Sequence, residues 1–102
     1  MYRGTTPTIS FTLSSDIDLN SSEQVWVTFE NHSKILTKSR SDLDIDAENN
    51  VIRLQLAQEE TLSFTPGEVK IQLRMLLADG NAIASRVEVT TVDRILQDGV
   101  IQ

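Results

Sequence analysis

The sequence predicts an all-β fold: an antiparallel, immunoglobulin-like β-sandwich of about seven strands with one short helical turn. Apolar and polar residues alternate through most of the chain, with the period of two that a half-buried strand requires. Turn-forming residues separate these segments at intervals of about 8 to 12 residues, as they do in sandwiches. The length of 102 residues is enough for one domain, so we expect residues 1–102 to form a single sandwich.

The first 40 residues of the chain contain three predicted strands. Residues 6–13, TPTISFTL, and residues 23–30, EQVWVTFE, show the clearest alternation. Their apolar residues, which we expect to face the core, are Ile9, Phe11, Leu13, Val25, Val27 and Phe29. Residues 31–33 predict a turn, and residues 34–38 predict a short returning strand.

A second hairpin is predicted for the segment SDLDIDAENNVIRLQL, residues 41–56. Pairing Ile45 with Ile52 places apolar residues on the same face of both strands. The same register sets Asp44 opposite Arg53 on the other face, where opposite charges favour the pairing. Hydrophobic pattern and charge therefore indicate one register.

Two segments depart from the strand pattern. Residues 57–64, AQEETLSF, lose the alternation and are rich in helix formers. We expect them to form one helical turn that connects the two sheets. The chain end, residues 93–102, predicts either a short helical turn that stops near Gly99 or a tail that leaves the domain.

The last hairpin, VKIQLRMLLADGNAIASRVEV, has a loop whose length decides which side chains face each other. A two-residue loop would place an inward residue opposite an outward one. A three-residue loop sets Arg74 opposite Arg86, where like charges are unfavourable. A five-residue loop, residues 77–81, sets Lys70 opposite Glu88, so we favour it. The residues of the second strand that we then expect to face inward are Ile83, Val87 and Val89.

Composition argues against several classes of function. The net charge of −6 repels phosphate backbones, so we expect no nucleic-acid binding. The nearest basic segment, with Lys34, Lys38 and Arg40, is typical of a solvated strand edge. The absence of cysteine excludes disulfides and thiolate metal sites. The start of the chain does not resemble a signal peptide, and no apolar run approaches the ~20 residues of a membrane span.

No motif in the sequence indicates catalytic chemistry. The single histidine, His32, lies in a predicted turn without a nucleophile motif beside it. Asp42, Asp44 and Asp46 have the spacing that begins a calcium loop, but the glycine that such a loop needs is missing. The adjacent glutamates at residues 59–60 have no predicted cleft beside them. We therefore expect no enzyme, no cofactor and no bound metal.

Three apolar residues depart from the expected alternation. Trp26, Leu36 and Leu76 are predicted to place apolar side chains on an otherwise polar face. Tryptophan is enriched at the energetic centres of protein interfaces, so these residues are candidates for protein contacts. In the alternative interpretation, Ile95 or Leu96 from the chain end covers Trp26 within the same molecule. We take all five residues as candidate interface residues.

Three segments of the chain resemble proteins of phages and prophages. They are RGTTPTISFTL near the start, LAQEETLSFTPGEVKIQLRMLLADGNAIAS in the middle and DRILQDGVI at the end. Together they resemble a group of small, uncharacterised phage and prophage proteins of Gram-positive bacteria, which are placed among tail and baseplate genes. The strand pattern also resembles the immunoglobulin-like N-terminal domain of the phage baseplate upper protein.

The resemblance implies a virion component or small accessory protein that is associated with a tail or baseplate and has no catalytic residues. Such a protein docks to other subunits, including copies of itself, through the edges and faces of its sheets. We expect it in the virion or in the host cytoplasm, without membrane contact. The acidic charge leaves one alternative open, a host-directed binding module that inhibits a basic bacterial protein.

Overall fold

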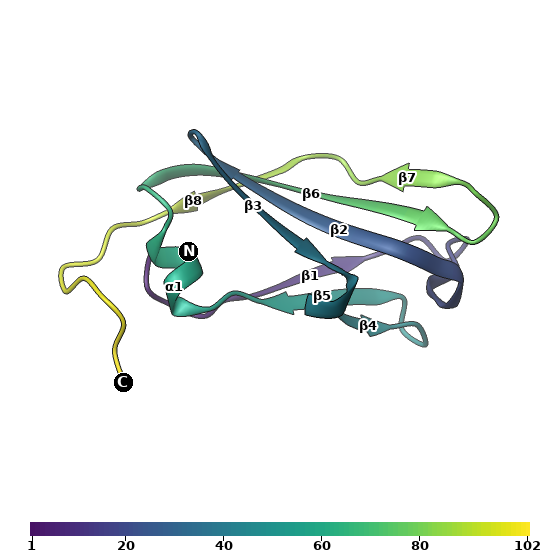
Figure 1. Cartoon of the computed structure of the whole chain (residues 1–102), viewed down its shortest axis with the longest axis horizontal. Coiled ribbons are helices and arrows are strands. Elements are labelled where there is room, and N and C mark those ends of the chain that lie inside the picture. Colours follow the sequence, from purple (N-terminus) through teal and green to yellow (C-terminus); the bar gives the residue numbers. More distant parts are fainter.

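The computed structural model describes residues 1–102 and confirms the predicted β-sandwich, in which two antiparallel sheets pack face to face (Figure 1). One sheet has the strand order β1-β5-β4; the other has the order β3-β2-β6, with β7 and β8 both paired to β6. The strands are β1 (Thr8–Thr12), β2 (Ser22–Asn31), β3 (Lys34–Ser39), β4 (Asp44–Asp46), β5 (Val51–Gln55), β6 (Gly67–Leu77), β7 (Ala82–Ala84) and β8 (Glu88–Val92). The helical turns are α1 (Gln58–Leu62), η1 (Leu19–Ser21) and η2 (Arg40–Asp42). None of these turns is long and apolar enough to cross a membrane.

The core lies between the inner faces of the two sheets. β2 and β6 supply the alternating residues of one face, and β5 supplies those of the other. The 13 buried apolar residues are Leu19, Val25, Val27, Phe29, Ile52, Leu54, Leu56, Phe64, Val69, Ile71, Leu73, Met75 and Val92. The rings of Phe29 and Phe64 lie 6.3 Å apart, so the segment that follows α1 is anchored in this core.

Two detailed predictions are confirmed. In the hairpin of β4 and β5, Ile45 lies opposite Ile52 and Asp44 lies opposite Arg53. The helical turn expected in residues 57–64 is α1, which connects β5 of one sheet to β6 of the other. In both cases the residue pattern and the local chemistry favour the same structure.

The last hairpin has the predicted five-residue loop, but its register changes along the strands. β6 and β7 pair Leu76 with Ala82, as this loop requires. Farther from the loop, β6 and β8 pair Lys70 with Val89. The expectation that Lys70 faces Glu88 is therefore wrong by one residue.

Ser85 accounts for this shift. Its N–H donates to the carbonyl oxygen of Leu73 at 2.9 Å, and its Oγ accepts from the Leu73 N–H at 3.0 Å. The Ser85 carbonyl, which would accept that N–H in a regular ladder, instead accepts from Nε2 of Gln72 at 2.9 Å. A shift of one residue exchanges the two faces of a strand. Val87 and Val89, which were predicted to face inward, are therefore 48% and 55% exposed, and the predicted last strand is divided into β7 and β8.

The first residues of the chain join the five-stranded sheet, although β1 belongs to the other sheet. Tyr2 forms a parallel bridge with Asp93, directly after the end of β8. Arg3 N donates to Asp93 O at 3.0 Å, and Asp93 N donates to Met1 O at 2.7 Å. Because the chain then crosses to β1, the N-terminal segment connects the two sheets.

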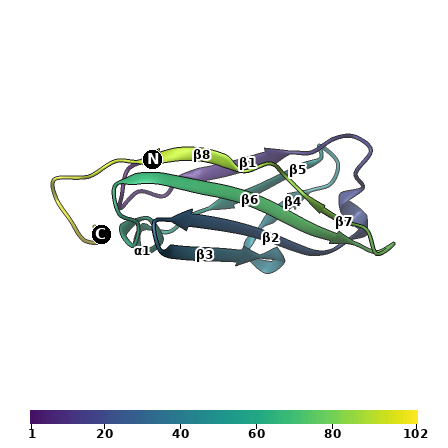
Figure 2. The same cartoon turned by 90° about the horizontal axis from the view of Figure 1, so that it is seen from above.

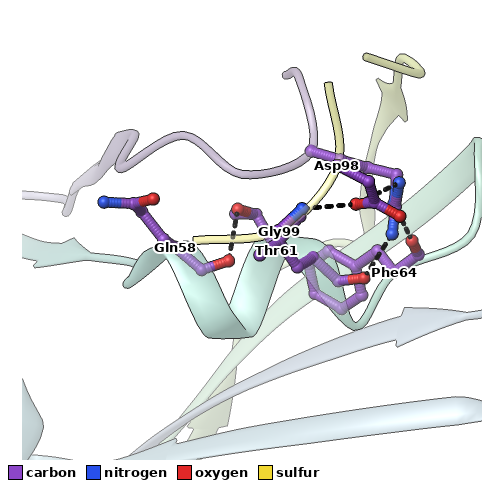
Figure 3. A network of polar contacts seen from close by, with 7 residues as sticks. Gln58, Thr61, Phe64, Asp98 and Gly99 are labelled. Atoms are coloured by element: carbon purple, nitrogen blue, oxygen red, sulfur yellow. Dashed lines mark hydrogen bonds and ion pairs between the residues drawn. The ribbon is translucent and has the colours of Figure 1, made fainter. Parts of the chain in front are cut away.

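The N-terminal segment, α1 and the chain end meet at one end of the sandwich (Figures 1 and 3). The Arg3 guanidinium donates to the carbonyl oxygens of Leu62 and Phe64, at 2.8 and 2.9 Å. These carbonyls lie at the C-terminal end of α1, where helical hydrogen bonds end and a cation is favoured. Arg3 also lies 3.3 Å from a carboxylate oxygen of Asp98, so one side chain connects all three segments.

The chain end contacts α1 and contains no helix. The side-chain amide of Gln58 exchanges hydrogen bonds of 2.9 and 3.0 Å with the backbone of Ile101. Ile95 packs so closely on Gly4 that a Cβ at that position would lie 3.1 Å from Ile95 Cδ1. The predicted helical turn near Gly99 is therefore wrong, because residues 94–102 form bends and no helix. The alternative, a tail that leaves the domain, is also wrong, because the segment stays in contact with Gly4 and α1.

We expect Phe64→Ala to lower the free energy of unfolding by about 3 to 5 kcal/mol, because it removes a buried ring and leaves a cavity. Urea denaturation followed by tryptophan fluorescence measures the change. The control is Leu96→Ala, whose side chain is 92% exposed and whose loss should cost less than about 0.5 kcal/mol. Equal losses in the two variants would contradict the place of Phe64 in the core.

Candidate protein-interaction surface

His32 and the glutamates at residues 59–60, for which the sequence indicates no catalytic chemistry, lie in or beside local turns of the chain. His32 lies in the turn between β2 and β3 with a φ of 54°, and its Nε2 is 3.4 Å from the Pro66 carbonyl oxygen. Glu60 accepts a hydrogen bond from Ala57 N at 2.8 Å at the start of α1, and its other oxygen pairs with Lys38 of β3. No group of three or more His, Cys, Asp and Glu side chains is arranged to hold a metal ion.

The three aspartates with calcium-like spacing each bond to a neighbouring part of the chain. Asp42 accepts a hydrogen bond from Ser39 N at 3.0 Å, at the start of η2. Asp44 and Asp46 flank Arg53, with nitrogen–oxygen distances of 3.5 and 3.6 Å. The spacing therefore reflects strand alternation and turn chemistry.

Asp46 also shapes the tip of the β4–β5 hairpin. Its two oxygens accept hydrogen bonds from the side-chain amide and the backbone N–H of Asn49, at 2.9 and 3.1 Å. These bonds, followed by the charge of Arg53, lower the pKa of Asp46 below its usual value of 3.8. The next residue, Asn50, has a φ of 59° and donates to the Ser14 carbonyl at 2.6 Å. The tip is thereby tied to the loop that follows β1.

An apolar patch lies on the outer face of the five-stranded sheet. Trp26 of β2 is 43% exposed and stands opposite Arg74 of β6. Leu76, two residues farther along β6, lies opposite Gln24 on one side and Ala82 on the other. We call Trp26, Leu76 and Ala82 the outer patch, with Gln24 and Arg74 at its rim. These residues line a hollow of about 220 Å³.

Leu36 does not belong to the outer patch. It lies opposite Phe29, and residues directly opposite each other in a sheet share a face. Leu36 therefore packs against the core, and the expectation that it lies beside Trp26 is wrong. Its neighbour Ile35 points outward instead and is 61% exposed.

The length of the β2–β3 turn explains this error. A three-residue turn at residues 31–33 would place Leu36 on the same face as Trp26. The turn has two residues, His32 and Ser33, because Asn31 is already paired with Lys34. The positive φ of His32 permits this tight reversal. One residue fewer in the turn inverts the faces of β3.

Ile95 and Leu96 lie away from the outer patch. The tail follows β8 and reaches α1, whereas the β6–β7 loop next to Leu76 is at the opposite end of the molecule (Figure 1). Ile95 is half-buried against Gly4, and Leu96 is exposed. The interpretation in which the chain end covers Trp26 is therefore wrong.

Sequence reasoning missed Ala82 as a member of the outer patch. The predicted loop length was enough to find it, because a five-residue loop pairs Ala82 with Leu76, as the structure does. The exposure of Val89 had no comparable signal, since it follows from hydrogen bonds made by the side chain of Ser85.

Comparisons with known proteins bear on the fold alone. No protein-family model matches the chain, and no curated protein matches it. A similar solved structure is that of a "putative glycoside hydrolase" from Bacteroides vulgatus ATCC 8482, with a TM-score of 0.57 and 16% sequence identity. The match covers 92% of this chain and spans 16% of the other chain. Similarity at this level concerns the sandwich architecture, which serves many unrelated functions.

We expect Asp46→Asn to lower stability at pH 7 and to approach the wild type as the pH falls. The pKa of Asp46 is lowered in the folded protein, so its carboxylate stabilises the fold above the unfolded-state pKa, near 3.8. This contribution disappears as the pH falls through the folded-state pKa. Urea midpoints across the acid range measure the difference.

Glu48→Gln changes an exposed carboxyl in the same hairpin and is the control for Asp46→Asn. It should lower stability less at pH 7, because Glu48 makes none of the hydrogen bonds of Asp46. A stability loss in Asp46→Asn that stays constant from neutral to acid pH would refute the role of the charged carboxylate.

Proposed function

We propose that this chain is a non-enzymatic structural or accessory protein of a phage or prophage tail or baseplate, and that it works by binding other proteins. The outer patch carries the proposal, because Trp26, Leu76 and Ala82 place adjoining apolar side chains on a solvent-facing sheet surface. Apolar groups that adjoin one another inside a polar rim are typical of surfaces where another protein docks.

The make-up of the patch suits a protein partner better than a small molecule. Tryptophan and arginine are among the residues enriched at the energetic centres of interfaces, and Trp26 lies directly opposite Arg74. The Trp26 N–H is 3.4 Å from the Gln24 side-chain oxygen. The hollow of about 220 Å³ is smaller than the roughly 300 to 1,000 Å³ of small-molecule sites, so it suits a single side chain of a partner.

The resemblance of three segments to phage and prophage proteins supports the setting in a tail or baseplate. The sandwich architecture agrees with the immunoglobulin-like domain of the baseplate upper protein, which the strand pattern resembles. A non-enzymatic role is supported by the side chains of Glu60 and Arg53, which form ion pairs within the chain itself.

The net charge of −6 favours a second candidate function, a host-directed module that binds and inhibits a basic bacterial protein. Such binding would be strong at low salt and weak at high salt, because the attraction between exposed charges is screened. It would also tolerate changes at Trp26, since charge and not apolar burial would supply the contact.

Trp26→Ser should weaken binding to tail or baseplate proteins roughly 30-fold, the loss expected when a central aromatic contact is removed. Co-purification of the tagged chain with the products of neighbouring genes, and immunoblots of purified particles, measure this binding. Ile35→Ser is the matched control, because Ile35 is exposed on the same sheet but lies outside the outer patch.

Absence from particles together with no binding to neighbouring gene products would sink the proposed function. Capture of one basic host protein at low salt, unaffected by Trp26→Ser, would favour the second candidate instead.

A further inference from the structure

We propose that the free edge of β1 pairs with the same edge of a second copy, so that the three-stranded sheets of two chains join into one antiparallel sheet. This inference rests on the proposed function in one respect, because it names a protein partner for the chain. It uses a different sheet and a different surface from the outer patch.

The backbone of β1 leaves a regular set of groups unpaired. β1 pairs with β5 alone: Leu13 N donates to Asn50 O at 2.9 Å, and Pro7 O accepts from Leu56 N at 3.0 Å. In an antiparallel pair every second residue bonds to the partner strand, and the residues between them point their N–H and C=O groups the other way. The residues of β1 with groups directed to the open side are Thr8, Ser10 and Thr12.

The other sheet edges have features that oppose pairing with another chain. β3 carries Lys34 and Lys38. β4 has three residues, of which Asp44 and Asp46 are charged. The edge formed by β7 and β8 is interrupted at Ser85. β1 has five residues without a charge, a proline or a bulge, so it is the edge most open to strand addition.

The sequence of β1, TISFT, suits pairing with itself. An antiparallel register centred on Ser10 sets this residue opposite its own copy. Thr8 then lies opposite Thr12 on the outer face, and Ile9 lies opposite Phe11 on the inner face. The Ser10 pair and the two threonine pairs are the positions that exchange hydrogen bonds, so all the free groups find partners. A two-fold axis through Ser10 closes the assembly at two chains.

A groove beside β1 provides space for the apolar side chains of the second copy. It has a volume of about 490 Å³ and lies between β1 and the segment that joins β7 to β8; Figure 2 shows β1 and β8 along the same long edge of the sandwich. Ile9, Phe11 and Leu13 line the groove and are half-buried. The pairing would place Phe11 of the second copy beside Ile9 and cover this apolar surface.

The charges at this edge favour a second copy over an unrelated strand. β1 carries no charge, so two chains of net charge −6 meet there without like charges facing each other across the join. Arg86 and Glu88 are the charged side chains that line the groove, and they already pair with each other at 2.9 Å. No unpaired charge is left to select a foreign partner.

Light scattering over a concentration series tests the proposal. The wild type should reach twice the chain mass of 11.4 kDa. Ser10→Glu sets two carboxylates face to face on the two-fold axis, whereas within one chain the new side chain lies opposite Arg53. It should raise the dissociation constant of the dimer at least about tenfold and leave the fold intact.

Two further variants serve as controls. Ser10→Pro tests the loss of strand pairing without an added charge, and Thr37→Glu tests the added charge away from β1. Ser10→Pro removes the N–H on the open side without removing a bond to β5, as an edge strand tolerates, and should also yield monomers. Thr37→Glu adds the same charge on the exposed face of β3 and should leave the dimer unchanged. Circular dichroism and urea midpoints confirm that each variant is folded.

Amide hydrogen exchange distinguishes the β1 residues whose N–H groups point to the open side from those whose N–H groups bond to β5. The amides of Thr8, Ser10 and Thr12 should exchange slowly in the dimer and fast in Ser10→Glu. Those of Ile9 and Phe11, which bond to β5, should exchange slowly in both.

A wild type that stays monomeric at all concentrations would overturn the proposal, as would a dimer that survives both Ser10 variants. A dimer that dissociates in Trp26→Ser and persists in Ser10→Glu would also overturn it and would place self-association on the outer patch. Binding of tail proteins is measured separately through Trp26→Ser, so a failure of the proposed function can be told apart from a failure of this inference.

Discussion

The register between β2 and β6 is the constraint on which the sandwich depends. Phe29 lies opposite Ile71, and a slip of one residue would turn the whole apolar face of this strand pair toward solvent. Asn31, at the end of β2, secures the register: its buried amide donates to Thr65 O and Glu68 O at 3.0 and 2.8 Å, and its oxygen accepts from Thr65 N at 2.8 Å. These three bonds fix where the chain turns from α1 into β6.

The sequence predicts strand pairing and strand faces correctly where two independent patterns agree. The prediction fails where a single side chain decides the path of the backbone. The predicted pairing of Ile45 with Ile52 is correct because their faces and the neighbouring charges indicate the same register. The predicted face of Val89 is wrong because the hydroxyl of Ser85 replaces the Ser85 carbonyl in the ladder. The predicted faces of β3 are inverted because His32 adopts a positive φ and shortens the turn. Alternation gives the spacing of a strand's faces, but turns and bulges decide which face points inward.

For the candidate site, too, the residue pattern predicts one part, and the strand register decides the rest. Trp26 could be singled out from its position between core residues, and the structure leaves it exposed. The apolar surroundings of Trp26 come from register, which brings Leu76 and Ala82 together from strands that are distant in sequence. The outer patch and the free edge of β1 lie on different sheets, so a second copy bound at β1 leaves Trp26 accessible to another protein. The proposed self-association at β1 and the proposed docking at the outer patch are therefore compatible with each other.

The parallel bridge between Tyr2 and Asp93 gives the domain a mechanical clamp. The first residues run in the same direction as those that follow β8, so tension on the two chain ends slides the segments past each other along their length. The bonds from Arg3 N to Asp93 O and from Asp93 N to Met1 O are then loaded together, in shear, and cannot open one after the other. The guanidinium of Arg3 passes part of the load to α1. A pull along the chain therefore has to break this small cluster before it can peel any strand from the sandwich.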